Sequence, residues 1–193
     1  HLPDTIEEAL QGEDKQEWQE ALDKELLAFK KNKIWKIVNK PKFAKELELK
    51  TVLALKSTKD LQLERRKVRI TAKGFRQLQN IEFNHTFAPT VRASNLRLTL
   101  ALINQHQMHA SQFDISNAFL LAEIEPEITI YVKPPKYLKL KEGQTLLLQK
   151  ALYGTKQAAR CWNLKFNNFM HKMGFKQLIN DDCMFIKKEH HRG

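Results

Sequence analysis

A strictly alternating segment, residues 67–73, constrains the fold of this chain more than any other stretch. It reads Lys-Val-Arg-Ile-Thr-Ala-Lys, so Val68, Ile70 and Ala72 point to one side while the basic and hydroxyl side chains point to the other. A half-buried β-strand satisfies this period of two, and Gly74 ends it. The chain therefore needs a sheet with one buried face and one positively charged face.

Three helices are expected from apolar residues at helical spacing. The first ends near Asn32 and carries its stripe on Trp18, Leu22, Leu26 and Phe29. The second begins with Ser94 as its N-cap and continues through Leu96, Leu100 and Ile103. The third ends at Gly174 and carries a stripe that we expect to be core: Trp162, Phe166, Phe169, Met170 and Met173.

Short strands are expected between these helices. They cover residues 34–38, 110–115, 128–132, 146–149 and 183–187, and residues 117–121 are expected to form a short turn of helix. The lysine-rich residues 42–60 fit no element clearly. Because helices and strands mix without a regular βαβ alternation, the expected class is α+β.

The composition narrows the classes of partner. There are 33 Lys+Arg against 22 Asp+Glu, a net charge of +11, which suits a polyanion but also suits an ordinary solvated surface. The two cysteines, Cys161 and Cys183, are too far apart in sequence for a CxxC pair, which argues against a disulfide framework or a cysteine zinc site. No apolar run or leader is apparent, so we expect an intracellular protein and no membrane partner.

One carboxylate occupies a position that calls for a role. Asp114 lies at the end of the strand expected over 110–115, between Phe113 and Ile115. An aspartate there is either a helix N-cap or a metal ligand, and local chemistry leaves both open. On the structural reading, Phe119 is simply a core aromatic.

Asp114 lies in a block, residues 112–120, that matches the pattern Gln-x-Asp-[Ile/Val]-x-x-Ala-[Phe/Tyr]-Leu. Six other blocks match patterns that occur with it in a fixed order: Trp18 to Pro41, Lys67 to Gln77, Thr86 to Arg92, Ile130 to Pro135, Leu152 to Trp162 and Asp181 to Phe185. Of these, Leu-Tyr-Gly-x-Lys-Gln is specific by itself. Together the seven blocks resemble the reverse transcriptase domain of Ty1/copia-type retrotransposons, in which the block around Asp114 is motif A.

The resemblance implies a fold and an activity. It implies the fingers and a partial palm of a right-hand polymerase, with fingers over about 1–105 and 120–157, and palm over about 106–119 and 158–193. The implied activity is that of an RNA-directed DNA polymerase, a nucleotidyltransferase acting on an RNA or DNA template–primer and dNTPs. The intact parent would be a transposable-element polyprotein that also carries integrase and RNase H regions.

The resemblance also implies a metal site and a sugar contact. Asp114 would be one of three catalytic carboxylates that hold two Mg²⁺ ions, and the Ile115 backbone carbonyl would be a further ligand. Phe119 would lie beneath the incoming sugar and disfavour a 2′-hydroxyl.

Two further segments acquire nucleotide-binding roles from the resemblance. Lys67 and Arg69 would meet the triphosphate, with Lys73 assisting, although a merely solvated strand face is the alternative. Tyr153, Gly154 and Gln157 would form the turn beside the nucleotide and template, where Gly154 allows the backbone to approach closely.

The family's other two metal ligands come from a Tyr/Phe-Val-Asp-Asp turn, and the printed chain ends at Gly193 before any such turn. Asp181-Asp182 is a poor substitute, because Asp181 matches the upstream Asp-x-Cys-[Leu/Val]-Phe block and no aromatic residue lies two positions before the pair. The expectation is therefore that these 193 residues alone have no polymerase activity. The alternatives are a non-catalytic nucleic-acid-binding remnant and an inert pseudogene product.

Overall fold

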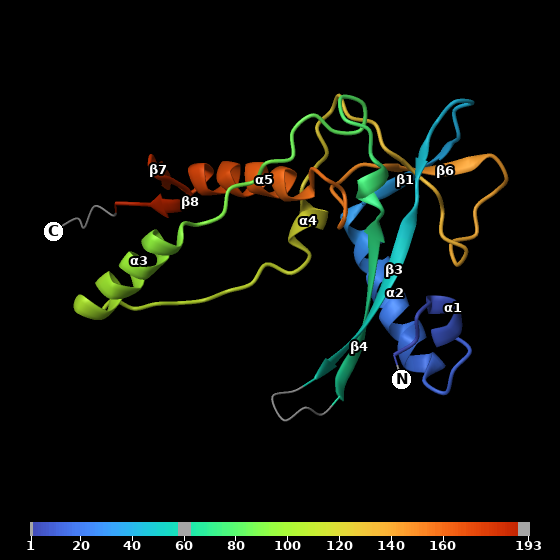
Figure 1. The fold of residues 1–193 in the computed structure, drawn as a ribbon, viewed down its shortest axis with the longest axis horizontal. Helices are drawn as coiled ribbons and strands as arrows, with labels where there is room; N and C mark the ends of the chain where they lie inside the picture. Colours follow the sequence, from blue (N-terminus) through green and yellow to red (C-terminus); the bar gives the residue numbers. More distant parts are fainter. Residues whose placement is uncertain (1, 58–62, 189–193) are drawn as a thin grey trace.

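The computed structural model describes residues 2–57 and 63–188, and its elements are labelled in Figure 1. The helices are α1 Ile6–Ala9, α2 Lys15–Asn32, the 3₁₀ turn Gly74–Arg76, α3 Ala93–Gln105, α4 Ala118–Leu121 and α5 Ala158–Lys172. The strands are β1 Trp35–Asn39, β2 Glu46–Leu47, β3 Leu49–Ser57, β4 Leu63–Ala72, β5 Tyr131–Val132, β6 Gln144–Leu148, β7 Lys176–Leu178 and β8 Asp181–Ile186.

The expected helix and alternating strand at the amino end are confirmed. Helix α2 ends at Asn32, with Lys33 in the left-handed conformation as its C-cap, and it buries Trp18, Leu22 and Phe29. Strand β4 pairs antiparallel with β3, from Leu49 opposite Ala72 onward. Because every second residue of β4 faces inward, Val68, Ile70 and Ala72 are buried.

A small mixed sheet holds the centre of the molecule. Its strand order is β1–β6–β5–β2, with β1 and β5 antiparallel to β6 and β2 parallel to β5. The strand expected over 34–38 is therefore confirmed, and the strands expected over 128–132 and 146–149 are present with shifted bounds. The unassigned residues 42–57 form β2 and the first strand of the β3–β4 hairpin, and residues 58–60 lie outside the described range.

Two apolar clusters stabilise the packing of α1, α2, the central sheet and the β3–β4 hairpin. The larger joins the end of α2 to the sheet and to β4, through Phe29, Ile34, Leu47, Ile70, Leu120, Ile130, Leu146 and Leu152. The smaller joins α1, the start of α2 and the hairpin, through Ile6, Trp18, Leu22, Leu53 and Val68. Burial of this apolar surface is the main term that stabilises the fold.

The expectation that the α5 stripe is core is wrong for part of the stripe. Phe169 is 57% exposed and Met173 is 50% exposed. Trp162 and Phe166 are half-buried, with ring centroids 5.8 Å apart, and Phe166 meets Phe185 of β8 at 5.9 Å. Strand β8 covers only part of this apolar face, so periodicity predicted the face correctly but not its coverage.

The strand expected over residues 110–115 is absent. This segment is extended but pairs with no described strand, and Phe113 is 79% exposed. A strand forms only where a neighbouring backbone completes its ladder, and none lies beside this segment. The helical turn expected over 117–121 is confirmed as α4, anchored by the buried Leu120.

Helix α3 has no buried residue, and Figure 1 shows it beside the β7–β8 hairpin at the end of the molecule away from the sheet. The predicted cap is wrong: Ser94 lies inside the helix and Arg92 is the N-cap residue. The mixture of helices, hairpins and a small mixed sheet is consistent with the predicted α+β class. Cys161 and Cys183 are both free.

Candidate functional site

Asp114 lies exposed on the extended segment between α3 and α4. The N-cap alternative is not supported, because α4 has Asn117 as its N-cap residue and no side chain bonds its first turn. Within the described ranges, no three His, Cys, Asp or Glu side chains are close enough together to hold a metal ion. Asp114 with the Ile115 carbonyl therefore does not form a complete magnesium site within these residues.

Two aromatic side chains from separate segments meet close to Asp114. The rings of Phe119, on α4, and Tyr153, on the turn after β6, have centroids 5.4 Å apart and are tilted by 52°. Burial raises the pKa of the Tyr153 hydroxyl, the charges of Glu25 and Asp114 raise it further, and Arg69 lowers it. Charged groups from α2, β4 and motif A therefore act on one phenol, which belongs to residues 153–157, the tyrosine turn.

The basic side chains of Arg65, Lys67 and Arg69 on β4 lie close to one another. Burial lowers the pKa of the Lys67 ammonium, and the nearby charges of Arg69, Arg65 and Lys56 lower it further, while Glu25 opposes them. Like charges held this close destabilise one another, and a bound anion would relieve the repulsion. The strand face therefore carries a concentrated positive charge.

Glu25 is a member of the site that sequence reasoning did not assign. It lies buried on α2, and its carboxylate accepts a hydrogen bond from the Ile70 amide at 3.3 Å. Burial raises the pKa of Glu25, whereas the Ile70 amide, Lys67 and Arg69 lower it. The signal was present in the sequence, because a glutamate between Leu22 and Phe29 interrupts an otherwise apolar stripe.

A cleft of about 260 Å³ lies between α2, β4 and residues 116–117, and Asp114, Phe119 and Tyr153 are not among its lining residues. It places the cations of β4 opposite the turn that follows Asp114. Its lining residues are Ala21, Lys24, Glu25, Ala28, Arg65, Arg66, Lys67, Val68, Ser116 and Asn117.

Close backbone contact fixes the tyrosine turn against the end of β4. The Ala72 amide donates to the Tyr153 carbonyl at 2.7 Å. Gly154 has a φ of +85°, and a Cβ atom there would overlap the Ala72 carbonyl oxygen. A Cβ atom on Gly74 would in turn overlap the Gly154 carbonyl oxygen. Gly154 therefore approaches the backbone of β4 closely, and its expected place beside the nucleotide and template stays a prediction.

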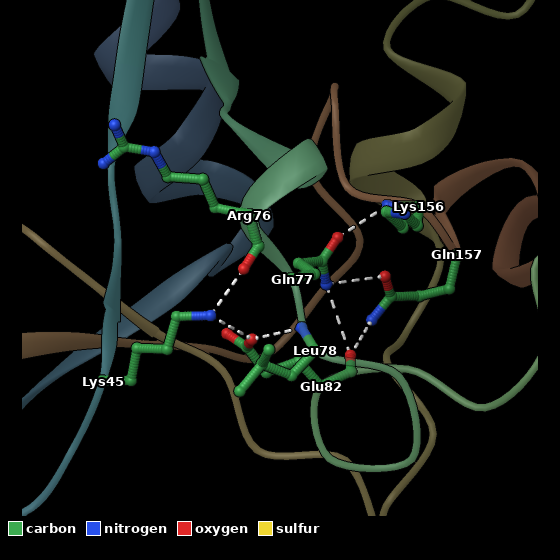
Figure 2. Close-up of polar contacts among 7 residues, drawn as sticks. All are labelled: Lys45, Arg76, Gln77, Leu78, Glu82, Lys156 and Gln157. Atoms are coloured by element: carbon green, nitrogen blue, oxygen red, sulfur yellow. Dashed lines mark hydrogen bonds and ion pairs between the residues drawn. The ribbon is translucent and has the colours of Figure 1, made fainter.

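Two of the predicted nucleotide-binding residues, Lys73 and Gln157, bond to other groups of the protein. Lys73 pairs with Glu48 at 2.6 Å, and this hydrogen bond holds the pKa of the Glu48 carboxyl below its usual range. Gln157 is only 2% exposed, and its amide bonds to Gln77 and to the Glu82 carbonyl, as Figure 2 shows.

Asp181 connects the β7–β8 hairpin to α3. Its carboxylate accepts hydrogen bonds from the Arg92 amide at 2.9 Å, the Asn95 side chain at 2.8 Å and the Cys183 amide at 2.9 Å. These bonds reach the amide of the N-cap residue and one first-turn side chain of α3, but not the first-turn amides that a Ser94 cap was expected to bond. A carboxylate engaged in this way is structural.

We expect the contribution of Asp181 to stability to disappear in acid. Hydrogen bonds from the Arg92 and Cys183 amides lower its pKa, so the carboxylate stabilises the folded state above its unfolded pKa and loses this effect as pH falls through the lower folded value. The free energy of unfolding in urea would be measured for the wild type and Asp181→Asn at about pH 6 and about pH 3. The difference between them should shrink at the lower pH; a constant difference contradicts the assignment. Asp182→Asn, at an exposed position, is the control.

The chain matches the family model described as "Reverse transcriptase (RNA-dependent DNA polymerase)" over residues 32–192. It therefore belongs to the reverse transcriptase family. Its relatives are Ty1/copia-type Pol polyproteins, which confirms the resemblance seen in the sequence motifs. No solved structure matches the chain. In the part of the chain that the structure describes, each helix is too short or too polar to span a bilayer.

Relatives come from plants and from yeast. The chain is 33% identical over 188 residues to the "Retrovirus-related Pol polyprotein from transposon TNT 1-94" of Nicotiana tabacum, covering 96% of this chain and 14% of the relative. It is 28% identical over 186 residues to that of transposon RE1 of Arabidopsis thaliana, covering 95% and 12%. It is 30% identical over 120 residues to the "Transposon Ty1-BL Gag-Pol polyprotein" of Saccharomyces cerevisiae, covering 62% and 7%. The chain thus spans about one seventh or less of these polyproteins.

Proposed function

We propose that this chain forms the nucleotide-binding fingers and part of the palm of a retrotransposon reverse transcriptase. The fingers would comprise about 1–105 and 120–157, and the palm about 106–119 and 158–193, although residues 1, 58–62 and 189–193 lie outside the described ranges. The observation that carries the proposal is the convergence of Asp114, Phe119 and Tyr153 with the cations of β4. These residues come from three separate segments, and the family's chemistry needs them together.

Each group has a proposed task in this site. Lys67 and Arg69 neutralise the triphosphate of an incoming dNTP, since an anion relieves their mutual repulsion. Lys73 assists once released from Glu48. Phe119, held against Tyr153, supports the sugar and disfavours a 2′-hydroxyl. Gly154 keeps the turn close to β4, and Gln157 holds the same turn.

Mg²⁺ is proposed as the metal of the intact enzyme, in keeping with the general divalent-metal dependence of the family. Asp114 supplies a hard, exposed oxygen ligand and the Ile115 carbonyl supplies another, while the remaining carboxylates come from outside the described residues. When bound, the ions neutralise the developing charge of phosphoryl transfer. With one carboxylate of its own, the 193-residue chain is proposed to bind its substrates without extending a primer.

A second candidate function, binding nucleic acid without catalysis, is favoured by a groove at the end of the central sheet. The groove has a volume of about 690 Å³ and is lined by five lysines, Lys40, Lys133, Lys136, Lys139 and Lys141. Of these, Lys40 pairs with Glu46. The Lys40 amide also donates to the Gly143 carbonyl at 2.8 Å, which continues the β1–β6 pairing beyond Asn39 and Gln144. A polyanion such as a template strand fits this charge.

Binding to a template–primer tests both candidates. Affinity for an RNA–DNA template–primer should fall steeply with salt, by roughly 0.7–0.9 in log K per unit of log salt for each phosphate neutralised. The double variant Lys136→Ala/Lys139→Ala should make this slope shallower by about 1–2. Lys30→Ala/Lys31→Ala removes the same charge from exposed positions at the end of α2 and should leave the slope unchanged.

A primer-extension assay with Mg²⁺ on the same sample separates the two functions. No incorporation is expected from the 193-residue chain. Binding of a dNTP that is weakened by Lys67→Ala supports the nucleotide site, whereas salt-dependent template binding with no dNTP binding favours the non-catalytic function. The proposal is that catalysis needs carboxylates besides Asp114. Clear incorporation of nucleotides would contradict it.

A further inference from the structure

A buried polar network lies beneath the tyrosine turn and outside the cleft. Gln77, Glu82 and Gln157 are 6%, 4% and 2% exposed, respectively. Figure 2 shows them meeting between the loop that follows β4 and the turn that precedes α5. Buried amides and carboxylates are costly unless they are hydrogen-bonded, so this cluster persists only if its contacts are made.

The contacts of Gln77 join the two segments directly. Its side-chain oxygen accepts a hydrogen bond from the Lys156 amide at 2.8 Å. Its side-chain nitrogen donates to the Gln157 side-chain oxygen at 3.1 Å and to the Glu82 carbonyl at 3.3 Å. With this set of partners the amide has one workable orientation, because only its oxygen can accept from Lys156.

The Glu82 residue fixes the other side of the network. Its carbonyl accepts from Gln157 at 2.9 Å, and its carboxylate accepts from the Leu78 amide at 2.7 Å. Lys45 pairs with the same carboxylate at 3.1 Å and also donates to the Arg76 carbonyl. The loop is therefore bound to the β2 side of the molecule as well as to the turn.

These bonds lie a few residues from the groups of the proposed site. Lys156 and Gln157 are separated from Gly154 only by Thr155. Gln77 follows the end of β4, which carries Lys67 and Arg69. The Ala72–Tyr153 backbone bond closes the other end of the same contact. Both segments are thus held at two points, and the position of the Tyr153 ring against Phe119 depends on both.

We propose that Gln77 and Gln157 are paired positioning residues, which set nucleotide affinity by holding the tyrosine turn on the end of β4 without touching the nucleotide. This deepens the proposed function and rests on it. A direct contact by Gln157 alone would leave Gln77 without influence on the nucleotide. Positioning instead makes the two glutamines equivalent, since losing either one breaks the Gln77–Gln157 bond.

The test uses substitutions that remove hydrogen bonds but keep side-chain size: Gln77→Met, Gln157→Met and the double variant. Each single variant should weaken dNTP binding about tenfold, because Gln77→Met removes three buried hydrogen bonds and Gln157→Met removes two, and both leave buried partners unpaired. The double variant should weaken dNTP binding by about the same factor as either single variant. Affinity for template–primer should change less than about twofold, because the lysine groove lies on other loops. Gln149→Met, at an exposed glutamine, is the control.

Amide hydrogen exchange provides a readout that does not need nucleotide. The Lys156 and Ala72 amides should exchange faster in both single variants and remain unchanged in the control. Loss of nucleotide affinity in Gln157→Met alone, with unchanged exchange, overturns the proposal in favour of direct contact. Equal weakening of nucleotide and template–primer overturns it in favour of general destabilisation. If the wild type binds no dNTP, the proposed function is wrong, and unchanged exchange then also overturns the paired holding of the turn.

Discussion

Replacing Gly154 by alanine is expected to destabilise the chain by about 3 kcal/mol. The residue has a φ of +85°, a conformation that costs an L-residue roughly 1–2 kcal/mol. The new Cβ atom would also overlap the Ala72 carbonyl oxygen and push the turn away from β4. This displacement would strain or break the Ala72–Tyr153 hydrogen bond, worth about 1–2 kcal/mol where its partners become buried and unpaired.

The chain offers a matched control for this substitution. Gly143 has a φ of +78°, but nothing lies within 4 Å of the Cβ atom it would gain. Gly143→Ala should therefore cost only the conformational part, about 1–2 kcal/mol. Urea unfolding followed by tryptophan fluorescence would measure both variants. Equal losses at the two positions would show that the contact with β4 contributes nothing.

Gly74, the first residue of the 3₁₀ turn that follows β4, makes a similar close contact. A Cβ atom there would meet the Gly154 carbonyl oxygen, so Gly74 leaves room for the backbone of Gly154 as Gly154 does for that of Ala72. The two matching blocks that contain these glycines, Lys67 to Gln77 and Leu152 to Trp162, are separate in sequence but form one unit in the fold. Substitution at either glycine should displace Tyr153 from Phe119 and so weaken the proposed nucleotide site as well as the fold.

Local periodicity predicted those elements whose burial is decided by their own pattern. The stripe on α2 and the alternation on β4 are confirmed because a helix and a strand each present one regular face to a core. Strand β2 was missed because it is two residues long and pairs in parallel with β5, far along the chain. Residues 110–115 have a strand-like pattern, yet no described backbone lies beside them. A sequence pattern predicts which side chains of a strand are buried, but it does not identify the strand that pairs with it.

The candidate site was likewise predictable from the sequence only in part. Motif resemblance selected Asp114, Phe119 and Tyr153, and the structure brings them together because α4 and the tyrosine turn share the core through Leu120 and Leu152. The motif resemblance did not distinguish exposed side chains of the site from their buried neighbours. Gln157 was therefore grouped with the nucleotide residues, although its amide faces Gln77. Glu25 was available from sequence, as a charge within an apolar stripe, but only the fold gives it Lys67 and Arg69 as neighbours.

Asp114→Asn is expected to lower primer extension by roughly three orders of magnitude in a polypeptide that joins this chain to a Val-Asp-Asp segment of the copia-type family. A metal clamp contributes several kcal/mol of charge stabilisation, and each ~1.4 kcal/mol is a factor of ten in rate. The amide keeps the size of the side chain but removes the anionic ligand, so folding and template–primer binding should be unchanged. Asp114 is exposed and makes no helix cap, which leaves its charge free for this role.

The matched control for this substitution is Asp182→Asn, another exposed aspartate on the same chain. It tests the rejected substitute site, because Asp181 is engaged by Arg92, Asn95 and Cys183 and only Asp182 of that pair has a free carboxylate to offer. Extension by Asp182→Asn should match the wild type within about twofold, since exposed substitutions away from a site rarely change more. If Asp182→Asn abolishes extension while Asp114→Asn retains it, the roles assigned to the two aspartates are reversed and the proposed site is in the wrong place.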